Sequence, residues 1–270
     1  MYIRAAHAET DLRVLRRLVR QNPLGLFTTA ISSHSFPFLQ SSHIPFVLDV
    51  EDEESDTELG RLRGHLARQN PQSKAIIEKT NCPKSPSLST NVLEHDVLVI
   101  FTAPEHHYVT PKFYTETKPA TGKVVPTWNY SAVQIYGRAK VYVDPKSATT
   151  FSFLQQQIHD LSEYSETTIM GYDGQGDKPG PWKVSDAPPN FVGLLSKAII
   201  GVEIEIQAME GKFKMSQEMG RGDSDGVIRG FQSLGTDAGR QIADTVLHRR
   251  QLKAHSEQIG LGVAQEKAER

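Results

Sequence analysis

The residues from 131 to 143 place the tightest constraint on how this chain folds. Apolar and polar side chains alternate along them, so that Val133, Ile135 and Val141 fall on one face. A period of two residues is typical of a β-strand with one buried face. Such a face must pack against other strands or helices, so the segment predicts a core built around a sheet.

The first hundred residues predict short strands in antiparallel order, with helices between them. We expect helices over 12–20 and 71–79, strands over 24–31, 43–49, 62–66 and 96–102, and loops over 51–58 and 80–90. Thr10 or Asp11 can cap the first helix, and Asn70 followed by Pro71 is a strong start signal for the second. The acidic loop over 51–58 is expected to be exposed.

The second half adds strands and peripheral helices. We expect a short strand at 108–109, helices over 144–161, after Asp186, from 225 and over 237–253, a connector over 171–181, and a hairpin over 200–216. The hairpin is expected to turn at Glu210 and Gly211. The helix after Asp186 is expected to face inward with its large apolar residues, Phe191, Leu194 and Leu195. The pattern as a whole favours an α+β fold, mainly antiparallel, with a small barrel and helices at its ends.

The composition excludes several classes of protein. Of the 270 residues, 38% are apolar and 23% charged, which is the balance of a soluble globular protein. A net charge of −2 gives no overall attraction to nucleic acid or acidic membranes. No apolar run approaches the roughly 18 residues of a membrane span, and the single cysteine, Cys82, allows no internal disulfide. We therefore expect a cytoplasmic protein.

Two segments carry candidate binding groups. Thr127, Trp128 and Asn129 place an aromatic ring beside small polar groups, which suits a planar ligand with polar edges; a buried Trp at a polar strand end is the alternative. Arg68 stands between a strand and the helix start at Asn70, where free N–H groups and a guanidinium favour an anion. Together the segments suggest a phosphorylated aromatic ligand.

The histidines do not predict a metal site. A metal needs three or four converging ligands, and only His106 and His107 are adjacent in sequence. Neighbours on an extended segment point apart. His65 is expected to lie in the core or at the edge of a cofactor.

Several blocks of sequence occur in the order of a known family. They are Pro23–Gly25, His43–Phe46, Gly64–Arg68 with Asn70–Gln72, Gly122–Tyr130, Pro181–Pro188, Gly201–Ile206 and Lys212–Gln217. Together they resemble the FMN-binding PaiB family, whose bacterial members are called negative transcriptional regulators. The resemblance covers roughly residues 1 to 232, which we expect to form an FMN-binding split-barrel domain. Residues 233–270 are expected to add a C-terminal helix and a polar tail.

The resemblance implies a split β-barrel, a homodimer, and FMN at the subunit interface. Pyridoxamine-phosphate oxidases and flavin reductases share this fold. Carried over by matching position, the cofactor-binding residues are Ser42, His43 and Ile44 along the isoalloxazine; Leu66, Ala67, Arg68 and Asn70 on the phosphate side; Thr127, Trp128 and Asn129 closing the site from the same or the partner subunit; and Trp182, Lys183, Lys214, Ser216 and Gln217 from later segments.

The chain departs from the family pattern in two motifs and two insertions. Ser73 stands near a position where the family often has Trp, and Glu218 replaces an amide at the end of the 212–218 block. Long gaps in the resemblance fall at 79–94 and 160–180. These differences indicate a divergent subgroup.

Three functions remain open at this stage. The first is an FMN-binding regulator of the PaiB type, for which the helix with Arg13, Arg16, Arg17 and Arg20 is the one DNA-reading candidate. A solvated helix face is the simpler interpretation of those arginines. The second is an FMN-dependent oxidoreductase acting on a small molecule, of the flavin reductase or pyridoxamine-phosphate oxidase kind. The third is a cofactor-free interaction protein.

Overall fold

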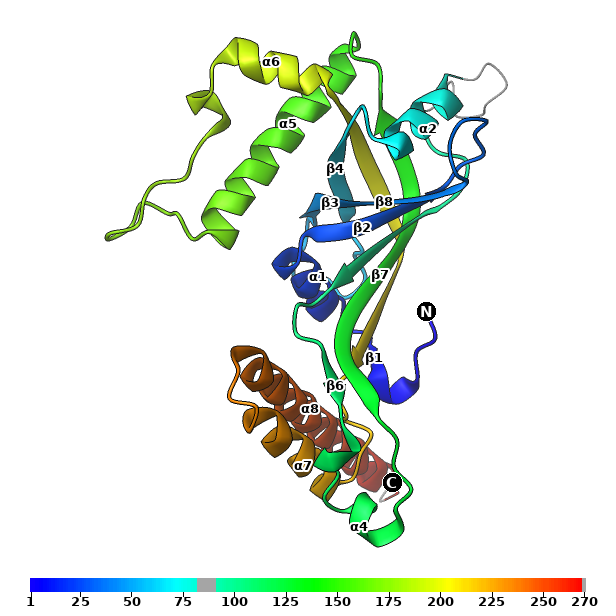
Figure 1. The fold of residues 1–270 in the computed structure, drawn as a ribbon, viewed down its shortest axis with the longest axis vertical. Coiled ribbons are helices and arrows are strands. Elements are labelled where there is room, and N and C mark those ends of the chain that lie inside the picture. Colours follow the sequence, from blue (N-terminus) through cyan, green and yellow to red (C-terminus); the bar gives the residue numbers. More distant parts are fainter. Residues whose placement is uncertain (82–90, 269–270) are drawn as a thin grey trace. The chain divides into compact units, whose positions relative to one another are not determined.

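The computed structural model describes the backbone of residues 1–81 and 91–268, and side chains through residue 255. It comprises two compact units (Figure 1). The barrel unit consists of Thr10–Phe101 and Val133–Glu210, and the terminal unit of Met1–Glu9, Thr102–Ala132 and Gly211–Arg270. Most of the expected loop at 80–90, with Cys82, lies outside the described residues.

Six strands close into a ring in the barrel unit. They are β2 (Leu24–Ala30), β3 (Leu39–Asp49), β4 (Arg61–Ala67), β5 (Val97–Thr102), β7 (Thr127–Tyr142) and β8 (Ile199–Lys214). Their hydrogen-bonded order is β8-β4-β3-β2-β5-β7, and a further pairing between β7 and β8 completes the ring. The pairs β2–β3, β2–β5, β3–β4 and β4–β8 are antiparallel. The expected α+β barrel with peripheral helices is confirmed.

The interior of the barrel follows from the alternation along each strand. Val133 and Ile135 on β7 are completely buried, as their spacing predicts. Three aromatic rings pack edge to face among the strands, with centroids 6.3 Å apart for Phe27 and Phe46 and 5.9 Å apart for Phe46 and Phe101. All three rings are buried, so each adds apolar area to the interior of the barrel.

Glycine allows the two closing strands to approach each other. A Cβ atom at Gly137 on β7 would lie 2.2 Å from the carbonyl oxygen of Glu205 on β8. No side chain fits at that distance, so closure of the ring depends on the absence of one.

We expect Gly137→Ala to lower the free energy of unfolding by about 1–3 kcal/mol, because the added methyl group must push β7 and β8 apart. Urea denaturation followed by circular dichroism measures the change. Gly180→Ala is the matched control, since its Cβ would meet no atom within 4 Å. Equal stability of the two variants would show that the strands separate at no cost.

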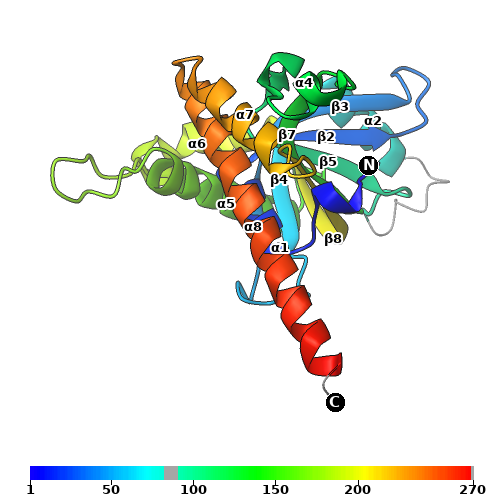
Figure 2. The ribbon, with the colours of Figure 1, turned by 90° about the horizontal axis from the view of Figure 1, so that it is seen from below.

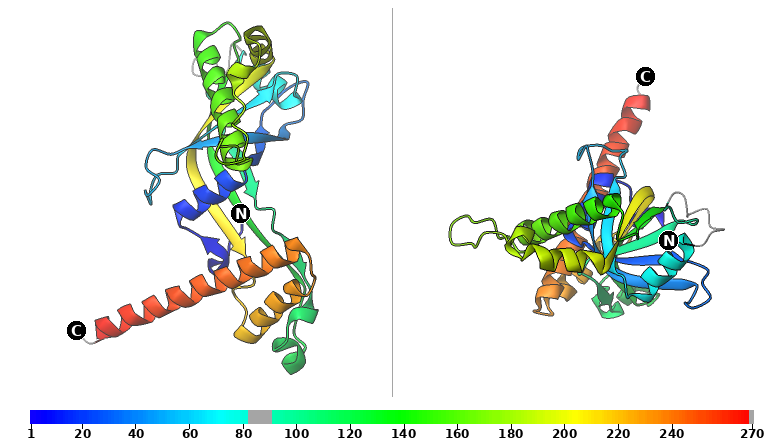
Figure 3. Two further views of the ribbon diagram at one scale, coloured as in Figure 1. Left: turned by 90° about the vertical axis from the view of Figure 1, so that its left-hand side faces the viewer. Right: turned by 90° about the horizontal axis from the view of Figure 1, so that it is seen from above.

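Helices cover the barrel unit on several sides. They are α1 (Leu12–Gln21), α2 (Pro71–Thr80), α5 (Ala148–Tyr164) and α6 (Pro189–Lys197), with short helical turns at η3 (Ser165–Ile169) and η4 (Val184–Asp186). Asp11 and Asn70 cap α1 and α2 through their side chains, as expected. Figure 3 shows α5 and α6 side by side, in contact with each other.

The predicted inward face of α6 is wrong. Phe191, Leu194 and Leu195 are 54%, 67% and 51% exposed. The buried residue of this helix is Ser196, whose hydroxyl accepts a hydrogen bond of 3.0 Å from Gln155 on α5. The helix therefore packs through a polar contact that apolar spacing does not reveal.

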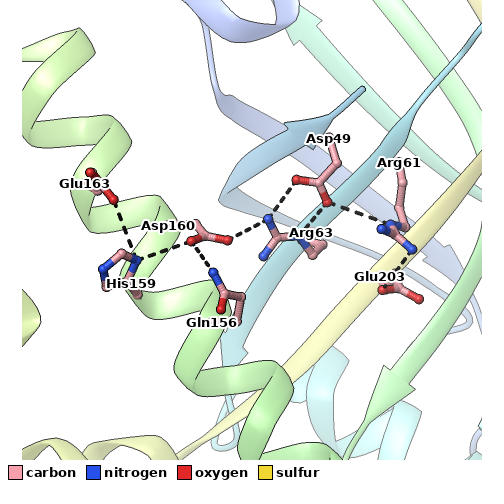
Figure 4. Close-up of polar contacts among 8 residues, drawn as sticks. All are labelled: Asp49, Arg61, Arg63, Gln156, His159, Asp160, Glu163 and Glu203. Atoms are coloured by element: carbon pink, nitrogen blue, oxygen red, sulfur yellow. Dashed lines mark hydrogen bonds and ion pairs between the residues drawn. The ribbon is translucent and has the colours of Figure 1, made fainter. Parts of the chain in front are cut away.

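An ionic network ties α5 to the strands (Figure 4). The Arg63 guanidinium on β4 donates hydrogen bonds of 2.5 and 2.7 Å to Asp49 on β3, and one of 2.8 Å to Asp160 on α5. Burial by itself raises the pKa of Asp160, but hydrogen bonds from Arg63, His159 and Gln156 outweigh it and hold the pKa below its ordinary value. The ionised carboxylate is therefore the form that stabilises the fold.

The lowered pKa of Asp160 predicts a loss of stability in acid. Its contribution is fully present above the ordinary carboxyl pKa of about 4, and it is lost as the pH falls through the lower pKa of the folded state. We expect Asp160→Asn to be less stable than the wild type at pH 7, with a difference that narrows on acidification. Denaturation midpoints at a series of pH values measure this, and a difference independent of pH would contradict it.

The terminal unit is a small helical assembly on short strands. Its elements are η1 (Ala5–His7), β1 (Ala8–Glu9), β6 (His107–Val109), η2 (Pro111–Phe113), α4 (Thr117–Thr121), α7 (Arg221–Gln232) and α8 (Asp237–Ala268). Figure 2 shows α8 as one long helix, and α7 packs along its first half around a core that includes Phe231, Met215 and Val246. No helix in the described part of the chain has the length and apolar character to cross a membrane.

The expected hairpin over 200–216 is wrong. β8 runs without a turn from Ile199 to Lys214. Gly211, the expected turn residue, pairs instead with Glu9 of β1, and Lys212 pairs with Ala8. The N-terminal strand supplies hydrogen bonds that make a continuous strand possible, and it lies some 200 residues away in the sequence.

Candidate functional site

The barrel unit brings together a hydroxyl and an amide at the start of α2. β4 ends at Ala67, and the chain turns sharply, with Asn70 N–H donating to the Ala67 carbonyl at 3.0 Å. The Asn70 side chain accepts a hydrogen bond from the N–H of Gln72, and its amide donates to the Ser42 hydroxyl, each at 2.9 Å. Two residues predicted for the cofactor site are therefore in direct contact.

Side chains alternate between the two faces of a strand, so the other predicted residues near this contact are either buried or exposed. The side chains of Ile44 and Leu66 are buried in the core, while His43 and Ala67 are exposed. Ile44 and Leu66 can reach a ligand only through their backbone. His43 lies opposite Leu26 in the β2–β3 pair, on the outer face of the barrel.

Arg68 is tied to the ends of two strands and one helix. Its guanidinium donates to the carbonyl oxygens of Val143 at 2.8 Å, Lys197 at 3.2 Å and Ile199 at 3.3 Å. It also borders a cavity of about 500 Å³ lined by α5 and α6. The partners of the guanidinium are neutral carbonyls, and they already fix its position.

Trp182 and Lys183 stand apart from these residues. Both are exposed and lie just before η4. The backbone N–H of Trp182 donates to Glu166, and that of Lys183 donates to Asp186. Among the residues described, neither contacts Ser42 or Asn70, so the structure does not join them to that pair.

A second cluster lies in the terminal unit, where β7 begins and β8 ends. The Lys214 ammonium donates to the Thr127 hydroxyl and, at 3.0 Å, to the Trp128 carbonyl. The Ser216 hydroxyl donates to the side-chain oxygen of Asn129 at 3.1 Å. Four of the predicted residues, together with the backbone of Trp128, are thus brought together.

One atom in this cluster is a buried donor without an acceptor. Asn129 is completely buried, and its amide nitrogen has no hydrogen-bond partner among the described residues. Gln217 uses both ends of its amide locally, accepting from the N–H of Met215 at 2.6 Å and donating to the Phe213 carbonyl. The Gln217 side chain therefore stabilises the local loop, whereas the Asn129 amide nitrogen is an unused hydrogen-bond donor.

Trp128 is not the buried core residue that the simpler interpretation predicted. It is 54% exposed and has two aromatic neighbours, Tyr108 and His106, each with a centroid distance of 6.2 Å. Sequence reasoning missed these neighbours. The signal was available only through the pairing of β6 with β7, which sets Tyr108 opposite Trp128.

His65 on β4 is half-buried in the barrel unit. Its Nδ1 atom has no partner among the described residues, and burial lowers the pKa of the ring. Its neutral form is therefore favoured, which agrees with a place in or near the core.

The arginines of α1 are mostly engaged within the barrel unit. Arg16 is 1% exposed and donates to the carbonyls of Glu58, Glu53 and Ser55 at 2.6, 2.8 and 2.7 Å. Arg20 forms a two-point contact with the Glu53 carboxylate. The expectation of a solvated face is wrong for Arg16, because the acidic loop folds against the helix.

Comparison with known proteins decides the family. Residues 1–208 match the model of a family described as "Putative FMN-binding domain". The chain belongs to this family. An uncharacterised protein of Aspergillus fumigatus is 57% identical over 94% of this chain and 99% of its own length. The protease synthase and sporulation protein PAI 2 of Bacillus subtilis is 26% identical over 90% of this chain and 95% of its own.

Comparison with solved structures gives a weaker likeness. The flavocytochrome Anf3 of Azotobacter vinelandii is 12% identical, with 76% of this chain and 68% of that chain covered and a TM-score of 0.40. The resemblance to PaiB-type proteins and the assignment of FMN as cofactor are confirmed by the family match and the Bacillus relative. The role of each site residue stays a prediction.

Proposed function

We propose that this FMN-binding family member has two groups of candidate cofactor-binding residues, each within one unit. One is the pair of Ser42 and Asn70 at the start of α2, with Arg68 beside it in sequence. The other is the group of Thr127, Asn129 and Lys214. The observation that carries the proposal is the buried side-chain amide of Asn129, which lies in a predicted cofactor motif. Its nitrogen has no hydrogen-bond acceptor among the described residues.

The residues present suit the chemistry of FMN. Its phosphate is a dianion, and Arg68 and Lys214 are cations whose protein partners are neutral oxygens. Its ring carries carbonyl oxygens and nitrogens along one edge, for which the Asn129 amide is a suitable donor. A buried polar group without a partner costs roughly 1–3 kcal/mol, which a ligand acceptor would recover.

The protein's part in the chemistry is to bind and orient. Bound FMN supplies hydride and electron transfer by itself. Lys214, held in place by Thr127 and the Trp128 carbonyl, presents a positive charge at a defined point. The exposed rings of Trp128 and Tyr108 offer an apolar surface for a planar group. The homodimer and the cytoplasmic location that the sequence suggests are part of the same proposal.

Lys214→Ala and Arg68→Ala are each expected to weaken FMN binding by about 1.5–3 kcal/mol, the usual effect of losing a hydrogen bond to a charged group. Titration of FMN into the purified full chain, followed in the visible flavin bands, measures the affinity. Lys112→Ala and Arg17→Ala are matched controls, since both residues are exposed and outside the clusters.

Thermal melts of each variant separate lost binding from lost folding, a distinction that matters most for Arg68, whose carbonyl contacts join three chain segments. A protein that leaves the FMN spectrum unchanged would overturn the cofactor site. Equal affinity in all four variants would move the site elsewhere.

Two roles for the FMN protein are open to test. A regulator of the PaiB type is supported by the family resemblance. An FMN-dependent oxidoreductase is favoured by the arginines of α1, because Arg16 and Arg20 are used to hold the acidic loop rather than left to meet phosphates.

For the oxidoreductase role we expect weak binding of duplex DNA, no tighter than the non-specific range of roughly 10⁻⁴–10⁻⁶ M at physiological salt. Fluorescence anisotropy with a labelled duplex measures it, and oxidation of reduced nicotinamide nucleotide by the FMN-loaded protein measures turnover. Tight DNA binding that Arg17→Ala weakens would instead establish direct DNA reading by α1.

A further inference from the structure

The terminal unit contains a cavity of about 370 Å³ beside the Lys214 cluster. Its walls come from the N-terminal segment, the residues leading into β7, the end of β8 and the start of α7. The volume lies within the range of small-molecule sites. Most of its lining belongs to no residue that the family motifs assign to FMN.

The cavity is left with unbalanced positive charge. Arg4, Lys123 and Lys214 line it, and none forms an ion pair within the described residues. Two carboxylates also line it: Glu218, which lies 3.0 Å from buried His7, and Asp223, which accepts from the N–H groups of Glu116 and Thr117 at 2.8 and 3.1 Å. Three cations against two carboxylates leave one excess positive charge, which an anionic ligand would offset.

A buried phenol provides an independent sign of a ligand. Tyr114 is 4% exposed and lines the cavity, and its hydroxyl has no hydrogen-bond partner among the described residues. Burial, with the nearby charges of Glu218 and Asp223, raises the pKa of Tyr114, so the hydroxyl stays protonated and can only gain by donating to an acceptor.

Val124, Val125 and Met219 supply apolar wall, so there is space for an organic group beside the anion.

We propose that this cavity binds a small phosphorylated molecule as a second ligand of the protein, distinct from FMN. A phosphate group carries the charge and the oxygens to accept from the Lys123 ammonium and the Tyr114 hydroxyl, neither of which is assigned to FMN. The proposal rests on the proposed function only in treating FMN as a separate ligand. The phosphorylated molecule would then be a substrate or an effector of the FMN protein.

Calorimetric titration of sodium phosphate into the FMN-saturated full chain, at constant ionic strength, tests this. We expect one site in the wild type, and affinity about tenfold weaker in Tyr114→Phe and in Lys123→Ala, equal to about 1.4 kcal/mol each. Neither residue belongs to the predicted FMN set. Tyr114→Phe keeps the buried ring, and Lys123 is exposed, so both variants should fold. Lys112→Ala, an exposed lysine of the same unit, should bind phosphate like the wild type.

Three results are decisive. Absence of phosphate binding, or equal binding in all variants, overturns the proposal. Binding only to FMN-free protein, with displacement by FMN, also overturns it and assigns the cavity to the FMN phosphate, leaving the proposed function intact. Phosphate binding that depends on Tyr114 and Lys123 in a protein that ignores FMN supports the cavity and removes the proposed function.

Discussion

The close approach of β7 and β8 at Gly137 is the contact on which the barrel depends. A side chain there would overlap the Glu205 carbonyl. Pairing of these strands turns an open sheet into a ring and leaves the six strands without a free edge between them. Once the ring is closed, alternation places Phe27 and Phe46 inside and residues such as His43 outside.

Asn70, Thr127 and Lys214 of the two candidate clusters lie at the ends of elements. β4 ends and α2 begins where Asn70 meets Ser42. β7 begins near the end of β8, which brings Thr127 to Lys214. The termini of strands and helices leave backbone donors and acceptors free, and the side chains there are not committed to the core. Binding groups can gather at such places without loss of packing.

Several arginine side chains in this protein stabilise the fold. Arg63 joins two strands to α5, and Arg16 holds three carbonyls of the acidic loop. Arg68, chosen from the sequence as a phosphate ligand, also spans three carbonyls. Each guanidinium has five donors in a planar fork, so one arginine can connect several segments and still leave donors for a ligand. An arginine-rich segment therefore does not by itself indicate nucleic-acid binding.

Local pattern determined the strand at β7, the caps at Asp11 and Asn70, and the order of motifs that places the chain in the FMN-binding family. These depend on residues a few positions apart, whose spacing is visible in the sequence. Only the tertiary structure decided that β8 runs straight through Gly211, because the β1 strand that pairs there lies at the other end of the chain. The same holds for the exposed face of α6 and for the unpartnered hydroxyl of Tyr114, since exposure and hydrogen bonding depend on distant segments that no local spacing records.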